Sequence, residues 1–118
     1  MREKAGISSG QDTREYAALF THRTLGPMVR MTVVDGYRFN LTCQEAGTLA
    51  RALAAVKDGR SAVDEVYLSP MGSDGKFHAK VHPDELVIAA MNPPLVLAWS
   101  EVGAIADALA AAVPESAA

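Results

Sequence analysis

The stretches FNLTCQEAGTLARALAAV (residues 39–56) and LVLAWSEVGAIADALAAA (residues 95–112) decide the fold of this chain, because they look like two copies of one unit. They align without a gap at an offset of 56 residues, and 8 of the 18 positions are identical. Half of the identities are alanine, in an alanine-rich chain. The identical pairs are Leu41/Leu97, Glu45/Glu101, Gly47/Gly103, Ala50/Ala106, Ala52/Ala108, Leu53/Leu109, Ala54/Ala110 and Ala55/Ala111. The pattern predicts a chain built twice from a strand-then-helix block.

The first copy carries the signals of a hairpin followed by a capped helix. Asp35-Gly36 separates β-branched and aromatic runs, which predicts a two-residue hairpin turn between strands at 28–34 and 37–42. Thr42 and Glu45 have the spacing of a capping box, and Asp58-Gly59 ends the helix that follows.

The second copy repeats this order. We expect strands at 85–91 and 95–99, then a helix over 101–113 that Ser100 caps. Gly47 and Gly103 recur in the first helical turns, where glycine is costly, so we expect each to allow close packing against backbone. Further strands are predicted at 15–21, 63–69 and 76–82.

Together these elements predict an α+β fold. It consists of two tandem copies of an antiparallel hairpin or meander followed by an α-helix, with a single mostly antiparallel sheet system and two helices. We expect one domain, residues 14–113, made of repeats 14–59 and 62–113. Residues 1–13 are predicted to form a disordered tail and residues 114–118 a frayed C-terminus.

The composition excludes several classes of protein. A net charge of −3 argues against a molecule that binds nucleic acid over its whole surface. The single cysteine, Cys43, excludes an internal disulfide and suits a reducing, cytoplasmic location. The N-terminal residues do not form a secretory signal, and no apolar stretch is long enough to span a bilayer, so no membrane partner is expected. The alanine-rich helices suit a bacterial protein.

Basic side chains gather on the polar faces of three predicted strands. Alternation along 28–34, 37–42 and 76–82 puts cations and histidines, and no carboxylate, opposite the apolar residues. They are Arg30, Arg38, Lys76, His78, Lys80 and His82. In the simpler interpretation these charged side chains are only hydrated by solvent, and they discourage the sheet from pairing with another chain at its edge. The functional alternative is a surface that binds nucleic acid or another anionic partner.

The strands of the second copy are apolar on both faces, which is typical of the centre of a sheet or of a subunit interface. Two short helices do not easily cover both faces of seven strands, so we predict a homodimer. The expected interface consists of Leu86, Ile88, Met91, Leu95 and Trp99.

No chemical motif predicts catalysis. His78 and His82 would lie roughly 13 Å apart along one strand, too far to share a metal ion. Cys43 corresponds to Trp99 in the second copy, which indicates a buried packing position. The Gly72–Lys76 segment is explained by a hairpin turn. We therefore predict no catalytic residue, no metal site and no cofactor, with an enzyme that uses Cys43 or the histidines as the weakest alternative.

A strand-rich unit followed by a helix, made twice, resembles the topology of the Whirly single-stranded-DNA-binding regulators. The resemblance concerns topology, and no functional residue is transferred from it. The sequence predicts a small non-catalytic cytoplasmic binding protein, a regulatory or accessory factor whose partner is nucleic acid, single-stranded or duplex, or an anionic protein. The alternative is a homo-oligomeric protein–protein interaction module that uses an apolar surface around 85–99.

Overall fold

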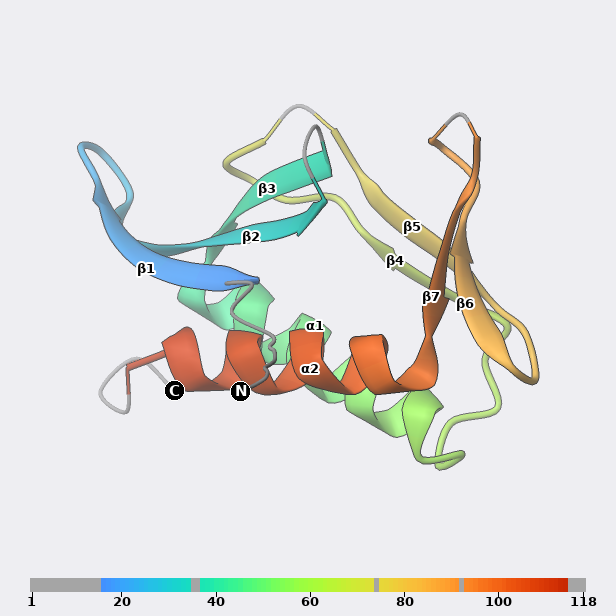
Figure 1. The fold of residues 1–118 in the computed structure, drawn as a ribbon. Helices are drawn as coiled ribbons and strands as arrows, with labels where there is room; N and C mark the ends of the chain where they lie inside the picture. The colour runs from blue at the N-terminus through green and yellow to red at the C-terminus, as the bar shows by residue number, and fades with distance from the viewer. Residues whose placement is uncertain (1–15, 35–36, 74, 92, 115–118) are drawn as a thin grey trace, which may run out of the picture.

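A computed structural model describes residues 16–34, 37–73, 75–91 and 93–114, and within these ranges seven strands and two helices surround one core (Figure 1). The predicted tail at 1–13, the Asp35-Gly36 turn and residues 115–118 lie outside the described residues. The elements in chain order are β1 (Ala17–His22), β2 (Gly26–Val34), β3 (Tyr37–Thr42), α1 (Cys43–Lys57), β4 (Glu65–Leu68), β5 (Phe77–Val81), β6 (Glu85–Ile88), β7 (Leu95–Ala98) and α2 (Trp99–Ala112).

The strands form two separate antiparallel sheets, each followed by a helix. The first sheet has the order β1-β2-β3 and the second the order β4-β5-β6-β7. The α+β class is therefore confirmed, whereas the expected single sheet system is wrong. At the edge of β3, the Asn40 amide donates to the Ser73 hydroxyl at 2.7 Å rather than to a further strand.

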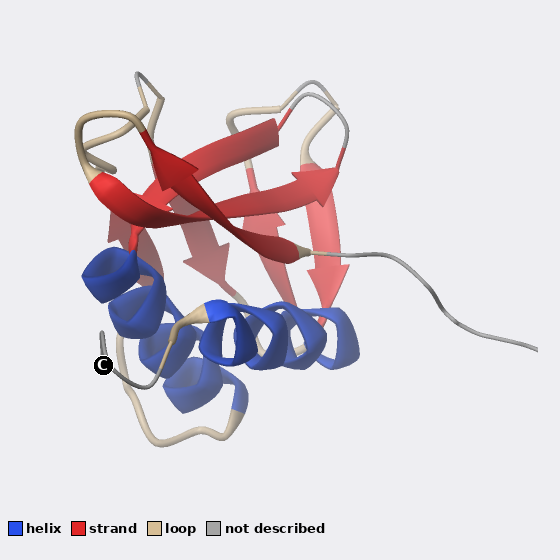
Figure 2. Cartoon of the chain, turned by 90° about the vertical axis from the view of Figure 1, so that its left-hand side faces the viewer, coloured by secondary structure: helices blue, strands red, loops and turns tan. Residues whose placement is uncertain are grey.

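The two helices lie beneath both sheets in Figure 1, and each helix contacts strands of both. Seen from the side of the first sheet, the second sheet lies behind it and the helices remain below (Figure 2). The buried residues form one cluster that all these elements share. The inner faces of the sheets therefore meet a common core, and their outer faces remain available to solvent or a partner.

The predicted alternation of side chains is confirmed on the strands that matter for the site. Val29 and Met31 are fully buried while Arg30 between them is exposed, and Phe39 and Leu41 are buried beside exposed Arg38. Burying an apolar side chain fully contributes about 1.5–3 kcal/mol to the free energy of folding. A shift of the strand register by one residue would turn these side chains outward and remove that contribution. The pattern therefore fixes which residues of β2 and β3 face outward.

A bulge in β2 disturbs the correspondence between the two halves. Val29 pairs with Leu41, whereas Leu86 pairs with Leu97, so the equivalent positions on β2 and β6 are 57 residues apart rather than 56. The register shift between Thr32 and Val34 accommodates the extra residue. The gapless alignment consequently holds for β3–α1 and β7–α2 but not for the strands before them.

The helix starts make matching hydrogen bonds. Cys43 donates its Sγ–H to the carbonyl oxygen of Pro27 at 3.6 Å, and Trp99 donates its Nε1–H to that of Pro83 at 3.1 Å. Cys43 is buried, as predicted. These two contacts, like the helix starts themselves, are 56 residues apart.

The helix caps match only in part. The capping box of Thr42 and Glu45 is confirmed. The second cap differs from the prediction, because Ala98 occupies the cap position and Ser100 lies inside the helix. Ala98 has no side-chain oxygen, so only its amide takes part, by donating to Glu101 Oε1 at 3.3 Å.

The repeated glycines do not pack against backbone. A Cβ atom at Gly103 would lie 2.7 Å from Lys57 Cε, so this glycine makes room for a side chain of the neighbouring helix. At Gly47 the nearest atom is Arg51 Nη1, at an ordinary 3.5 Å. The two positions therefore differ, and only Gly103 supports a close contact between helices.

Candidate anion-binding site

The outer face of the first sheet brings two arginines together. Arg30 lies opposite Asn40, and Thr32 lies opposite Arg38, so Arg30 and Arg38 are diagonal neighbours on β2 and β3. Phe20 on β1 lies opposite Met28 and therefore points to the same side. Three strands thus supply one polar surface with a half-buried aromatic ring at its side.

A loop converts this surface into a hollow. The β4–β5 connection passes over the edge of β3, and Ser73 joins Arg30, Arg38 and Asn40 around a cavity of about 330 Å³, which we call the anion pocket. The loop is anchored by the hydrogen bond from the Asn40 amide to Ser73 and by one from the Met71 amide to Glu45 Oε2 at 3.0 Å.

Glycine at position 72 lets this loop lie close to β2 and β3. A Cβ atom there would approach Met28 Cε to 2.7 Å and the Asn40 carbonyl oxygen to 3.1 Å. Met28, although on the outer face, is fully buried. The close approach of the loop therefore both covers Met28 and places Ser73 at the anion pocket.

The electrostatics of the anion pocket favour a negative ligand. Arg30 donates its Nε–H to Asn40 Oδ1 at 3.2 Å, and its guanidinium carbon lies 4.5 Å from the centre of the Phe20 ring. Within the described ranges Arg38 makes no hydrogen bond or ion pair, and none of the four described lining residues is acidic. Two cations, neither of them paired with an acid among the described residues, therefore border a hollow that water or an anion can enter.

The remaining predicted site residues lie on the second sheet. His78 and Lys80 point outward from β5, where Glu65 of β4 contacts the His78 ring and lies opposite Lys80. Lys76 places its ammonium nitrogen 5.9 Å from the centre of the Tyr67 ring. His82 follows the end of β5 and lines a different cavity. The six predicted residues therefore do not form one patch, and only Arg30 and Arg38 converge.

Two groups that contact β5 or the residue before it have shifted pKa values. The hydrogen bond and charge of His78 lower the pKa of the exposed Glu65 carboxyl, which favours the carboxylate beside Lys80. Burial raises the pKa of Tyr37, whose hydroxyl donates to the Lys76 carbonyl oxygen at 3.4 Å. The outer face of β5 is thus partly neutralised by an acid, in contrast to the anion pocket.

Sequence reasoning missed three contributors to the anion pocket region: Phe20, Asn40 and Ser73. Asn40 was assigned to the correct face but was not proposed as a site residue. The alternation of 17–22, continued from the register of β2, would have placed Phe20. The sequence contains no signal that the loop holding Ser73 crosses β3.

Two of the five residues of the predicted oligomer interface lie inside the molecule. Leu86 and Ile88 have no exposed surface, because they fill the core that the second sheet shares with the helices. Met91, Leu95 and Trp99 are half-buried. Instead, the apolar residues that β6 and β7 turn outward are Val87, which is half-buried, and Val96, which is 49% exposed. Leu86 and Ile88 are therefore not available to an interface, whereas Met91, Leu95 and Trp99, like the oligomeric state itself, stay predictions.

Comparison with known proteins gives no match: no family model, no curated protein and no solved structure corresponds to this chain. Neither of the helices in the described part of the chain is long and apolar enough to cross a membrane.

Proposed function

We propose that this protein binds single-stranded nucleic acid through the outer face of the first sheet, and that it acts as a non-catalytic regulatory or accessory factor. The observation that carries the proposal is the anion pocket, where Arg30 and Arg38 converge and none of the described lining residues is a carboxylate. Arginine is suited to phosphate because its planar guanidinium donates two parallel hydrogen bonds.

The neighbours of the arginines favour a nucleic acid over a simple inorganic anion. Asn40 and Ser73 add neutral hydrogen-bonding groups at the pocket, and Phe20 adds an aromatic face beside Arg30. A positively charged groove next to an aromatic side chain is the combination that single strands use, because phosphates follow the charge and bases stack on the ring. A duplex is usually read by a helix or a two-stranded ribbon that projects into a groove, whereas the two arginines here border a hollow on the face of a sheet.

The two-copy organisation is part of the proposal. The matching hydrogen bonds of Cys43 and Trp99 and the matched glutamates of both helix starts support two copies of one unit. The copies have diverged on their outer faces, since the first presents two arginines and the second presents a mixed surface. We therefore assign binding to the first unit and not to both.

The test is a titration of an oligothymidylate of about 16 nucleotides, labelled with fluorescein, followed by fluorescence anisotropy at several salt concentrations. Two phosphate contacts predict a slope of about −1.4 in a plot of log K against log salt, at about −0.7 for each contact. A duplex of the same length is expected to bind more weakly. Absence of binding at low salt, or binding that ignores salt, would contradict the proposal.

Self-association is a second candidate, favoured by the free edge of β7. Its Leu95–Ala98 segment exposes Val96, and of the usual protections of an edge strand it has shortness, at four residues, but neither charge nor proline. We expect β7 to pair with β7 of a second copy, giving a dimer mass by light scattering at tens of micromolar. Val96→Lys should return the mass to that of a monomer, and a monomeric wild type would eliminate this candidate.

A further inference from the structure

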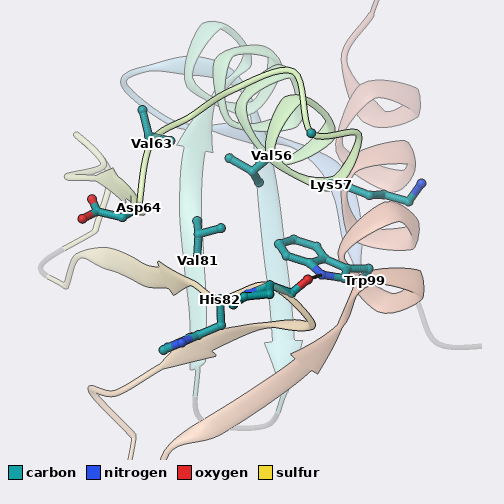
Figure 3. Close-up of a pocket in the computed structure, with 9 residues that line it drawn as sticks. Val56, Lys57, Val63, Asp64, Val81, His82 and Trp99 are labelled. Carbon is teal, nitrogen blue, oxygen red and sulfur yellow. Dashed lines mark hydrogen bonds between the residues drawn. The ribbon is translucent and has the colours of Figure 1, made fainter.

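A second cavity, of about 450 Å³, lies where four segments meet: the end of α1, the connection from α1 to β4, the start of α2 and the turn between β5 and β6 (Figure 3). Its apolar lining consists of Val56, Val63, Val81 and Trp99. The volume is within the range of about 300–1,000 Å³ that is usual for small-molecule sites. We call it the tryptophan cavity.

Trp99 is larger than its structural contact requires. Its ring donates a hydrogen bond to the Pro83 carbonyl, and in the first unit the thiol of Cys43 makes the corresponding contact to Pro27. The fold is thus satisfied by a small donor at this position. Because the indole is fixed by that bond and only half-buried, it presents a preorganised aromatic surface to the cavity.

The charged residues around the tryptophan cavity do not point into its centre. The Lys57 side chain runs toward α2, where its Cε lies against Gly103, and its ammonium group is 3.7 Å from the Asp58 carboxylate. Figure 3 shows the Asp64 carboxylate and the His82 ring directed away from the indole. The groups that face the centre of the cavity are therefore the indole ring and two valines. Such a lining favours an uncharged and mostly apolar ligand.

We propose that the tryptophan cavity binds a small, uncharged aromatic molecule that packs on the Trp99 indole, with Val56 and Val81 as the apolar wall. Ring–ring packing adds about 0.5–1.5 kcal/mol to the burial of apolar area, and this favours an aromatic over an aliphatic ligand. The site is separate from the anion pocket, since the two share none of their described lining residues.

The experiment uses the neutral fluorescent probe N-phenyl-1-naphthylamine, whose emission rises in apolar surroundings. The full-length chain should enhance this emission and show quenching of Trp99, its single tryptophan. Val63→Glu puts a charge at the rim and should weaken probe binding by about fivefold or more, because the carboxylate resists desolvation. The matched control is Leu19→Glu, an apolar residue of β1 with similar exposure (50%, against 52% for Val63) that lies outside the cavity, and it should leave probe binding unchanged.

Three results would overturn the proposal: no enhancement with the wild-type chain, equal weakening by both substitutions, or a change of molecular mass on Val63→Glu, which would assign this surface to a second copy of the chain. Circular dichroism must show that both variants fold. Oligonucleotide binding, measured on the same variants, should be unchanged. A failure of the tryptophan cavity would therefore be distinguishable from a failure of the anion pocket.

Discussion

Replacing Arg30 and Arg38 together by alanine is expected to weaken the binding of single-stranded oligothymidylate about 100-fold at low salt. A hydrogen bond to a charged group contributes about 1.5–3 kcal/mol, and each 1.4 kcal/mol corresponds to a factor of ten. Two lost phosphate contacts therefore amount to about two orders of magnitude. The slope of log K against log salt should lose about 1.4 in magnitude as well, since the same two contacts release the counterions.

Two control double substitutions distinguish binding at the anion pocket from a general effect of removing positive charge. Arg51→Ala with Arg60→Ala removes the same charge from exposed positions away from the anion pocket and should weaken binding less than about threefold. Lys76→Ala with Lys80→Ala tests the outer face of β5 and should likewise have a small effect. If the lysine pair weakens binding as much as the arginine pair, the second sheet is the binding face and the assignment to the first sheet is wrong.

Ser73 and Gly72 explain why the sequence could predict the arginines but not the pocket. Alternation on β2 and β3 is a local pattern set by burial of Val29, Met31 and Phe39, and it correctly put both arginines on one face. The loop that completes the pocket is held by contacts to Asn40 and Glu45, more than 25 residues away in the chain. Such contacts depend on tertiary packing and leave no periodic signal in the sequence.

The division of the strands into two sheets could not be predicted from the sequence either, because it also depends on contacts between distant segments. Hairpin turns and helix caps are encoded within a few residues, and the β2–β3 pairing and the Thr42–Glu45 box were predicted correctly. Whether the edge of β3 pairs with a further strand depends on residues distant in the chain, and here the Ser73 hydroxyl accepts from the Asn40 amide. Once the strands divide into two sheets, Leu86 and Ile88 face a shared core. Their apolar character, taken for an interface, is explained by that burial.

Phe77→Ala is expected to lower the free energy of unfolding by about 3–5 kcal/mol, the largest effect on stability that we predict. Phe77 is 1% exposed and extends from β5 of the second sheet to β3 of the first. Its ring centre lies 6.2 Å from that of Phe39 and 6.3 Å from that of Tyr37. The substitution removes a large buried ring and also the aromatic contacts that join the two sheets, and the loss is measured by urea unfolding monitored by circular dichroism.

A loss of this size is a large part of the roughly 5–15 kcal/mol that stabilises a typical domain, so the alanine variant can fail to fold. Phe77→Leu keeps most of the volume and should cost less than about 1.5 kcal/mol, which leaves a folded protein for comparison. Phe20→Ala is the matched surface control, because this ring is only half-buried and contacts Arg30 on the outer face; it should cost clearly less than Phe77→Ala. A loss below about 1 kcal/mol for Phe77→Ala would mean that its ring does not hold the two sheets to a common core, because a buried phenylalanine leaves a cavity that neighbouring side chains fill only in part.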